Sequence, residues 1–200
     1  ELALQESEVQ LRRLYELSPI GIALNDYVSG AFLDVNEALL SPTQYSRDQL
    51  MAMDYFELLP PDFENHRQQI IAELQSERRF GPYEVEIVRA DGSTYPAIVR
   101  GMRISNPSGQ PLIWTLIEDI SERKKVDRMK SEFISTVSHE LRTPLTSISG
   151  SLSLVESGTL GALPSQAERM VSIAHRNAEQ LKQLVDDLLD MEKLVSGKMT

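Results

Sequence analysis

The first half of this chain contains several short apolar segments, and in one of them, residues 83–89, hydrophobic and polar residues alternate. Each segment is bounded by turn-forming residues such as Asn, Asp, Pro and Gly, which indicates a β-strand. The predicted strands cover residues 20–24, 31–35, 83–89, 94–104 and 112–118. Asp91-Gly92 predicts a tight hairpin between the third and fourth strands. Pro96 indicates that the fourth strand lies at an edge of the sheet or carries a bulge.

Helices are predicted before and between these strands. A loose apolar stripe over residues 1–17 predicts a helix or linker that ends before Pro19, because the residue preceding a proline disfavours continued helix. Asn36 predicts the N-cap of a helix after the second strand, and two more helices are expected at Asp48–Leu59 and Asp62–Gln75. This order indicates an α+β domain, with an antiparallel sheet and helices on one face.

After Ser121, apolar residues recur at steps of three and four, which is the period of an amphipathic helix. The first set predicts a helix over residues 121–156 with a seam of Val126, Met129, Phe133, Val137, Leu141, Leu145, Ile148, Leu152 and Val155. A loop is expected at 157–163. The second set predicts a helix over residues 164–196 with a seam of Ala167, Met170, Ala174, Ala178, Leu181, Leu184, Leu188, Met191 and Leu194. One hairpin buries only part of this apolar surface, so we expect two copies to form a four-helix bundle.

Composition divides the chain at the same place. Every lysine lies at Lys124 or later, and all aromatic residues except Phe133 come before Ser121. We therefore expect domains at 18–120 and 121–200. The net charge of −10 argues against nucleic acid or an anionic membrane as the main partner. The absence of cysteine excludes a disulfide scaffold, a Cys-ligated metal and a cysteinyl chromophore.

No apolar run approaches the length of about 18 residues that a membrane-spanning helix needs. We accordingly expect no membrane segment in these 200 residues.

The order of elements over residues 12–120 resembles a PAS domain. Residues 117–124 (Ile-Glu-Asp-Ile-Ser-Glu-Arg-Lys) resemble the signature with which PAS domains end. The resemblance implies that 18–120 is a sensor domain, and that its last strand is coupled to the helix that follows. Asp119 and Arg123 are four residues apart, a spacing at which the two side chains can bridge on a helix. An ordinary charge pair at a helix start is the alternative.

A PAS domain can hold a ligand in its core, and the sequence leaves that ligand open. Haem-binding PAS domains often use a histidine on a nearby helix, which makes His66 a candidate. Its polar neighbours indicate instead that His66 faces water. A small-molecule cavity or a plain core is expected to be lined by Phe32, Tyr83, Ile98 and Trp114.

The first long helix contains a chemically distinctive segment, Ser138-His139-Glu140-Leu141-Arg142-Thr143-Pro144-Leu145. His139 lies two residues from the nearest seam positions, so it points about 200° away from the seam, into solvent. Thr143, four residues on, shares its face. Pro144 costs roughly 3 kcal/mol in a helix interior and leaves the Glu140 carbonyl without its helical donor.

This segment closely resembles the H-box of sensor histidine kinases, and residues 130–137 and 187–198 resemble the flanking sequences of that family. The resemblance implies that His139 attacks the γ-phosphate of ATP through Nε2 and becomes phosphohistidine. It implies that Glu140 orients the ring and accepts its proton, and that Thr143 positions the water that dephosphorylates the regulator. Arg142 is expected to serve local ion pairing or partner contact.

The resemblance also implies the partners: a second copy of the chain, the receiver domain of a response regulator, and an ATP-binding domain that holds ATP and Mg²⁺. No Gly-rich phosphate loop occurs in the sequence. We therefore expect that ATP-binding domain to begin after Thr200, and this chain not to autophosphorylate alone. The parent is expected to be a cytoplasmic histidine kinase, with or without a membrane anchor upstream.

Two other functions fit parts of the sequence. The PAS-like half and the long helices together can serve as a dimerisation module without phosphotransfer. A haem- or small-molecule-binding sensor with another output is the second alternative. The combination of His139, Glu140, Thr143 and Pro144 in one segment favours the histidine kinase.

Overall fold

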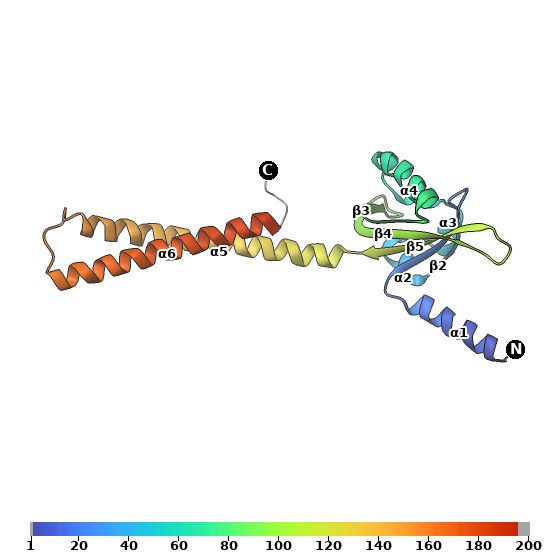
Figure 1. Cartoon of the computed structure of the whole chain (residues 1–200), viewed down its shortest axis with the longest axis horizontal. Helices are drawn as coiled ribbons and strands as arrows, with labels where there is room; N and C mark the ends of the chain where they lie inside the picture. Colours follow the sequence, from blue (N-terminus) through green and yellow to red (C-terminus); the bar gives the residue numbers. More distant parts are fainter. Residues whose placement is uncertain (1, 196–200) are drawn as a thin grey trace. The chain divides into compact units, whose positions relative to one another are not determined.

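A computed structural model describes the backbone of residues 2–195, and their side chains except at 2–5, 8, 62, 64–66 and 195. The chain divides into two compact units, Glu1–Arg123 and Lys124–Thr200 (Figure 1). No helix in the part of the chain that the structure describes is both long enough and apolar enough to cross a membrane.

The first unit is built on a five-stranded antiparallel sheet with the order β2-β1-β5-β4-β3. The strands are β1 (Gly21–Asp26), β2 (Phe32–Val35), β3 (Arg79–Val88), β4 (Thr94–Ser105) and β5 (Pro111–Asp119). Inward-facing residues from these strands form the core, including Ala23, Val35, Ile87, Ala97 and Ile117. The antiparallel sheet predicted from the sequence is confirmed.

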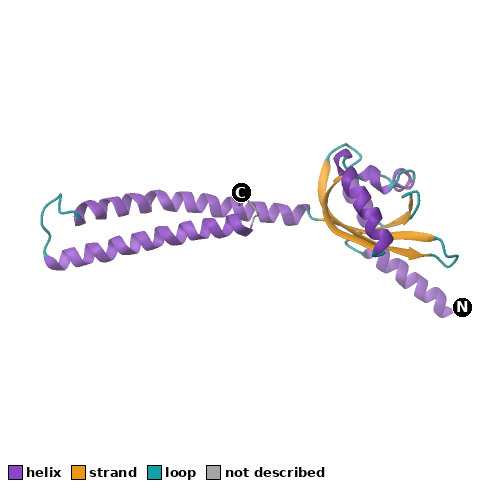
Figure 2. Cartoon of the chain, turned by 45° about the horizontal axis from the view of Figure 1, so that its top comes forward, coloured by secondary structure: helices purple, strands orange, loops and turns teal. Residues whose placement is uncertain are grey.

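The helical segment between β2 and β3 covers one face of the sheet (Figure 2). Its elements are α2 (Glu37–Thr43), α3 (Arg47–Met51), the 3₁₀ turns η1 (Tyr55–Leu58) and η2 (Pro61–Phe63), and α4 (Glu64–Ser76). Helix α1 (Leu2–Leu17) precedes β1 and ends before Ser18-Pro19, as the proline predicts. The single helix expected at Asp48–Leu59 is wrong. It is divided because the Asp54 side chain accepts a hydrogen bond from Phe56 N (2.8 Å) and starts a separate 3₁₀ turn.

The edge or bulge expected at Pro96 is also wrong. Strand β4 lies between β5 and β3, and the irregularity in the β3–β4 pair falls between Phe80 and Tyr83. Pro96 is tolerated because β5 ends at Asp119, opposite Ala97, so the ladder has stopped on that side. The Pro96 carbonyl accepts a hydrogen bond from Ile120 N (3.0 Å), the residue after the strand.

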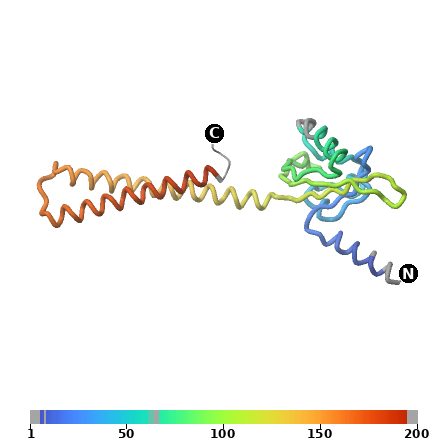
Figure 3. Tube along the Cα trace, viewed as in Figure 1, coloured from blue at the N-terminus to red at the C-terminus, as the bar shows by residue number. Residues whose placement is uncertain are grey.

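The second unit is a helical hairpin, which confirms the predicted all-α class. Helix α5 (Ser121–Glu156) runs out to a turn, and α6 (Ser165–Val195) returns beside it (Figure 3). Gly158 and Gly161 adopt positive φ in this turn (71° and 110°), where other residues are strained. The second helix begins one residue later than predicted, with the Pro164 carbonyl accepting from Glu168 N (3.0 Å). Residue 196, its predicted end, lies outside the described residues.

Asn36 joins three segments of the first unit and is fully buried. Its Oδ1 accepts hydrogen bonds from Ile22 N (2.8 Å) and from Leu39 N (3.2 Å), which makes it the N-cap of α2. Its Nδ2 donates to the carbonyls of Tyr15 and Ile20, both at 3.0 Å. The N-cap expected at this position is therefore confirmed, and it also fastens the end of α1 and the start of β1.

Asn36→Ala removes all four of these bonds and leaves buried backbone groups without partners. We expect it to lower the unfolding free energy of the first unit by roughly 3–5 kcal/mol. Urea denaturation followed by Trp114 fluorescence measures this change. Asn106→Ala is the control, because the bonds of Asn106 lie in an exposed turn, and it should cost about 1 kcal/mol or less. Equal losses for the two variants would contradict the role assigned to Asn36.

Candidate functional site

Helix α5 presents the H-box residues on its exposed side. His139, Glu140 and Thr143 are exposed, and Thr143 Oγ1 donates a hydrogen bond to the His139 carbonyl (3.3 Å). No carboxylate or cation is paired with the His139 ring in the described part of the chain. The geometry thus leaves both ring nitrogens open to a reacting partner, as the two-residue offset from the seam predicts.

The face of α5 that meets α6 is more polar than expected. From residue 131 on, the half-buried or buried residues of α5 are Ser131, Ile134, Val137, Ser138, Arg142, Leu145, Ser149, Leu152 and Val155. Ser138, next to the candidate phosphoacceptor, is 1% exposed, and its hydroxyl has no hydrogen-bond partner among the described residues. Small or polar residues therefore occupy about half of the interface that the two helices share.

Side-chain contacts join the helices at several levels. Arg142 Nη2 lies 2.6 Å from Asp186 Oδ1, with both side chains 38% exposed. Near the turn, His175 Nδ1 lies 2.6 Å from Glu156 Oε2. Near the other end, Ser131 donates to the carboxylate of Glu192. These contacts set the antiparallel register of the hairpin.

The continuous apolar seam predicted for each helix is split in two. Leu145 and Leu152 do face α6, but most of the seam residues are exposed in the single chain. The large exposed side chains are Val126, Met129, Phe133, Leu141, Ile148, Met170, Leu181, Leu184, Leu188, Met191 and Leu194. Residues spaced by three and four can lie on either of two adjacent faces of a helix. The pattern therefore does not distinguish the face that meets the partner helix from the exposed apolar face beside it.

The exposed apolar residues of the two helices lie on the same side of the hairpin. On α5, the exposed Leu141 and Ile148 lie about 60° and 80° from the direction of Ser138, in the sense opposite to His139. On α6, Leu188 lies about 80° from Ala178, in the same rotational sense. Because the helices are antiparallel, these rotations bring both stripes to one side and leave His139 on the other.

Pro144 lies inside α5 and weakens its backbone next to His139. A proline has no N–H, so the Glu140 carbonyl lacks its usual donor. The neighbouring carbonyls receive extra bonds: Thr143 Oγ1 donates to His139 O, and Thr146 Oγ1 donates to Arg142 O (2.8 Å). The site segment is therefore held partly by side-chain hydroxyls.

The start of α5 differs from the expected charge pair. Asp119 Oδ1 accepts a hydrogen bond from Ser121 N (2.8 Å) and so caps the helix. Among the described residues the structure records no ion pair between Asp119 and Arg123, and Arg123 is exposed.

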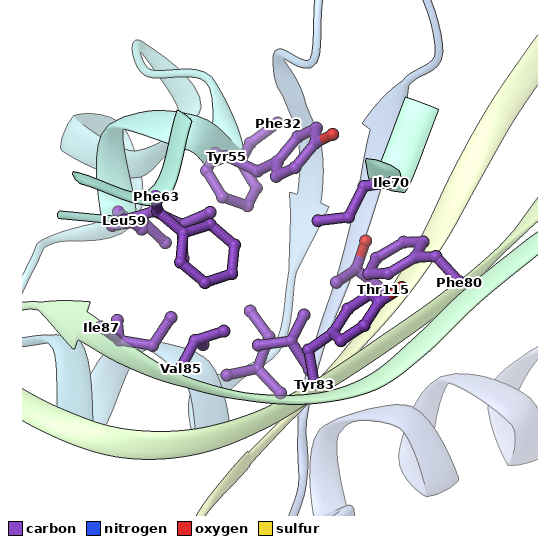
Figure 4. A pocket seen from close by; sticks show the side chains of 13 residues that line it. Phe32, Tyr55, Leu59, Phe63, Ile70, Phe80, Tyr83, Val85, Ile87 and Thr115 are labelled. Carbon is purple, nitrogen blue, oxygen red and sulfur yellow. The ribbon is translucent and has the colours of Figure 1, made fainter. Parts of the chain in front are cut away.

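The core of the first unit contains a small apolar cavity between the sheet and its helices. Its volume is about 20 Å³, which is room for about one water molecule. Figure 4 shows its lining side chains, which include Phe32 and Tyr83 as expected. Trp114 and Ile98 do not line it, and Trp114 is 42% exposed on the opposite face of the sheet. The side chain of His66, on α4, lies outside the described residues.

The part of the chain that the structure describes contains no group of three or more His, Asp or Glu residues arranged to hold a metal ion.

Comparison with known proteins places both units. Residues 19–122 match the family profile of the PAS domain, and residues 129–197 match that of the His Kinase A (phospho-acceptor) domain. The hybrid signal transduction protein dokA of Dictyostelium discoideum is 30% identical over 196 residues, covering 94% of this chain. The chain belongs to the PAS domain family and carries a His Kinase A (phospho-acceptor) domain after it.

Further relatives agree with this assignment. The sensor protein kinase WalK of Staphylococcus saprophyticus is 38% identical over 81 residues, or 40% of this chain. The chain spans 11% of the length of dokA and 13% of the length of WalK. Among solved structures, the PAS domain of a protein from Colwellia psychrerythraea has a TM-score of 0.53 at 17% identity. It covers 58% of this chain and 98% of its own. This structure supports the PAS fold alone.

The sequence predicted the H-box of the His Kinase A domain but not the residues of α6 that contact α5. Asp186, the partner of Arg142, and the Glu156–His175 pair near the turn emerge only from the register of the hairpin. That register depends on how the turn after α5 folds. If α6 shifts along α5 by one helical turn, apolar positions still meet apolar positions, so the periodic pattern does not distinguish the two registers. The length of the loop limits the possible registers between α5 and α6, and the ion pairs between the helices identify the one that forms.

The Glu156–His175 contact leads to a prediction about pH. The hydrogen bond with His175 holds the pKa of Glu156 below its ordinary value of 4.5. The folded value is thus lower than the unfolded one, so the contact stabilises the hairpin above about pH 4.5. That stability is lost as the pH falls through the folded pKa.

NMR titration of the Glu156 side chain should therefore give a midpoint below 4.5, and His175→Ala should raise that midpoint. Glu156→Gln should flatten the pH dependence of the melting temperature in the same range. A midpoint at or above 4.5 in the unaltered chain would contradict the contact.

Proposed function

We propose that this chain is the sensory and phosphoacceptor part of a two-component sensor histidine kinase, with His139 as the phosphoacceptor. The observation that carries the proposal is the exposed His139 beside Glu140 on α5, on the side of the hairpin away from its apolar stripe. The match of residues 129–197 to the His Kinase A (phospho-acceptor) domain supports the same reaction.

The phosphoacceptor reaction is a phosphoryl transfer to the imidazole ring. The Nε2 lone pair forms a bond to the γ-phosphorus of ATP, the bond from that phosphorus to the bridging oxygen breaks, and ADP leaves with the electron pair. Imidazole suits this role because it is partly neutral and nucleophilic near pH 7. Mg²⁺ bound with the nucleotide neutralises charge on the phosphates.

Glu140 and Thr143 serve the same site in this proposal. Glu140 accepts the Nδ1 proton of the phosphorylated ring, which removes the positive charge that the transfer creates. A carboxylate of a receiver domain then attacks the phosphorus while Glu140 returns the proton to Nδ1, and the N–P bond breaks with its electron pair left on Nε2 of a neutral imidazole. Thr143 positions the water that later hydrolyses the receiver phosphate. ATP and receiver domains are cytoplasmic, so we place the chain there.

The nucleotide site belongs to another domain. The described residues contain no phosphate-binding glycine loop, and the glycines of the hairpin, Gly150, Gly158 and Gly161, have nothing packed against them. We infer that the ATP-binding domain of the family supplies ATP and Mg²⁺ to His139.

Two copies of the chain form the bundle in this proposal. The apolar stripes of α5 and α6 lie on one side and form a surface too extensive for an isolated soluble hairpin. Pairing two hairpins through this side covers the stripes and leaves both His139 residues facing solvent.

The PAS domain is proposed to regulate the transfer. Strand β5 ends at Asp119 and α5 begins at Ser121, so no flexible linker separates the sheet from the helix. A change in the sheet can pass to α5 as rotation or tilt. The cavity in the core of the PAS domain, of about 20 Å³, admits only a water-sized molecule, so binding of a larger stimulus molecule there requires the core to open.

Phosphate labelling tests the acceptor. The chain with labelled ATP alone should stay unlabelled, and addition of an ATP-binding domain of this family should label it. His139→Gln should abolish the label. His175→Gln, which alters the other histidine of the hairpin, should retain it. If the His139→Gln protein is labelled at the original rate, His139 is not the phosphoacceptor, and the alternative of a dimerisation module is favoured.

Sedimentation equilibrium tests the dimer. The unaltered chain should sediment at twice its mass of 22.5 kDa. Ile148→Glu places a charge in the apolar stripe, and it should weaken association at least tenfold because burying an unpaired charge is costly. Ser153→Glu adds the same charge to an exposed position on the His139 side of α5 and should leave association unchanged. If both substitutions weaken association equally, the dimer interface does not lie on the apolar stripe.

A further inference from the structure

Arg142 lies one turn beyond His139 and points to a different neighbour. Its guanidinium reaches across the hairpin to Asp186 (2.6 Å), whereas His139 faces solvent. The two positions are about 60° apart around the helix axis. The direction in which Arg142 is held therefore fixes the direction in which the His139 ring leaves the helix.

This segment has few other constraints on its rotation. Ser138 and Ser149 face α6 with hydroxyls that lack partners, so they give no directional contact. The bonds of Ser131 and Glu156 to α6 lie more than two helical turns from His139. Pro144 also removes one backbone bond from the segment itself.

Ion pairs that are partly exposed contribute little to stability. The pair between Arg142 and Asp186 is 38% exposed on both sides, so its main effect is on geometry. A directional contact beside a weakened stretch of helix selects one rotation among several of similar free energy.

We propose that Arg142 and Asp186 are positioning residues for phosphoryl transfer to His139. The pair holds the kinked segment of α5 against α6 at the rotation that presents Nε2 to a protein donor. This inference rests on the proposed function of His139 and adds the residues that orient it. Neither side chain touches the reacting atoms.

Two phosphoryl donors separate orientation from ring reactivity. The first is an ATP-binding domain of this family with ATP, which must meet His139 in one geometry. The second is phosphoramidate, a small donor that reaches an exposed ring from many directions. With it, Nε2 forms the N–P bond, the P–N bond of the donor breaks, and ammonia leaves.

Arg142→Gln and Asp186→Asn should each lower the maximal rate from the protein donor at least tenfold. The donor concentration at half-maximal rate should stay unchanged, and so should the phosphoramidate rate. The exchanged pair, Arg142→Asp with Asp186→Arg, should recover most of the rate. Asp187→Asn is the matched control, because Asp187 is exposed and, among the described residues, its side chain is bonded to Gln183 on its own helix (2.8 Å) and to no residue of α5. Circular dichroism should show equal helix content in all variants.

Each other outcome is decisive. If both single variants transfer at the original rate, the inference is wrong. If only Arg142→Gln is impaired, Arg142 contacts the donor directly, and positioning through Asp186 is wrong. A loss with both donors would mean damage to the ring or the fold, which also contradicts positioning. An unaltered chain that neither donor labels would instead overturn the proposed function of His139.

Discussion

The helical period of α5 ties three surfaces of the hairpin to one another. Consecutive residues are about 100° apart, so Val137, Ser138 and His139 point to the apolar side, to α6 and to solvent. No rotation of the helix can change one of these surfaces alone. The direction of the apolar side, the contact with α6 and the exposure of the histidine therefore change together.

The contact between α5 and α6 is only partly apolar. It contains buried serines without hydrogen-bond partners and an ion pair that is partly exposed. Large apolar side chains such as Phe133 and Leu184 remain outside it, at 69% and 57% exposure. Most of the hydrophobic free energy available to this hairpin would therefore come from covering its apolar side, as in the proposed dimer, rather than from its own two helices. Covering that side is also compatible with small adjustments between α5 and α6.

The sequence predicted elements whose signal is local. The strands of the sheet, the cap at Asn36 and both long helices follow from periodicity and from turn residues, and the H-box follows from its residue pattern. Prediction from the sequence was wrong where contacts between distant segments determine the local structure. The Asp54 side chain divides a stretch with good helical pattern, and Pro96 sits in a central strand because its neighbour has already ended. The division of the seam, and the partner of Arg142, depend on a register that no local pattern contains.

Pro96 also connects the sheet to the start of α5. Its carbonyl accepts from Ile120 N, and Asp119 at the end of β5 accepts from Ser121 N. Ile120 is thus bonded to β4, and Asp119 bonds the end of β5 to the first residue of α5. Because proline has no N–H, this position offers only an acceptor on that side. A movement of β4 relative to β5 must then strain the first residues of α5 or carry them along, and Ile120, which is 4% exposed, has little room to yield.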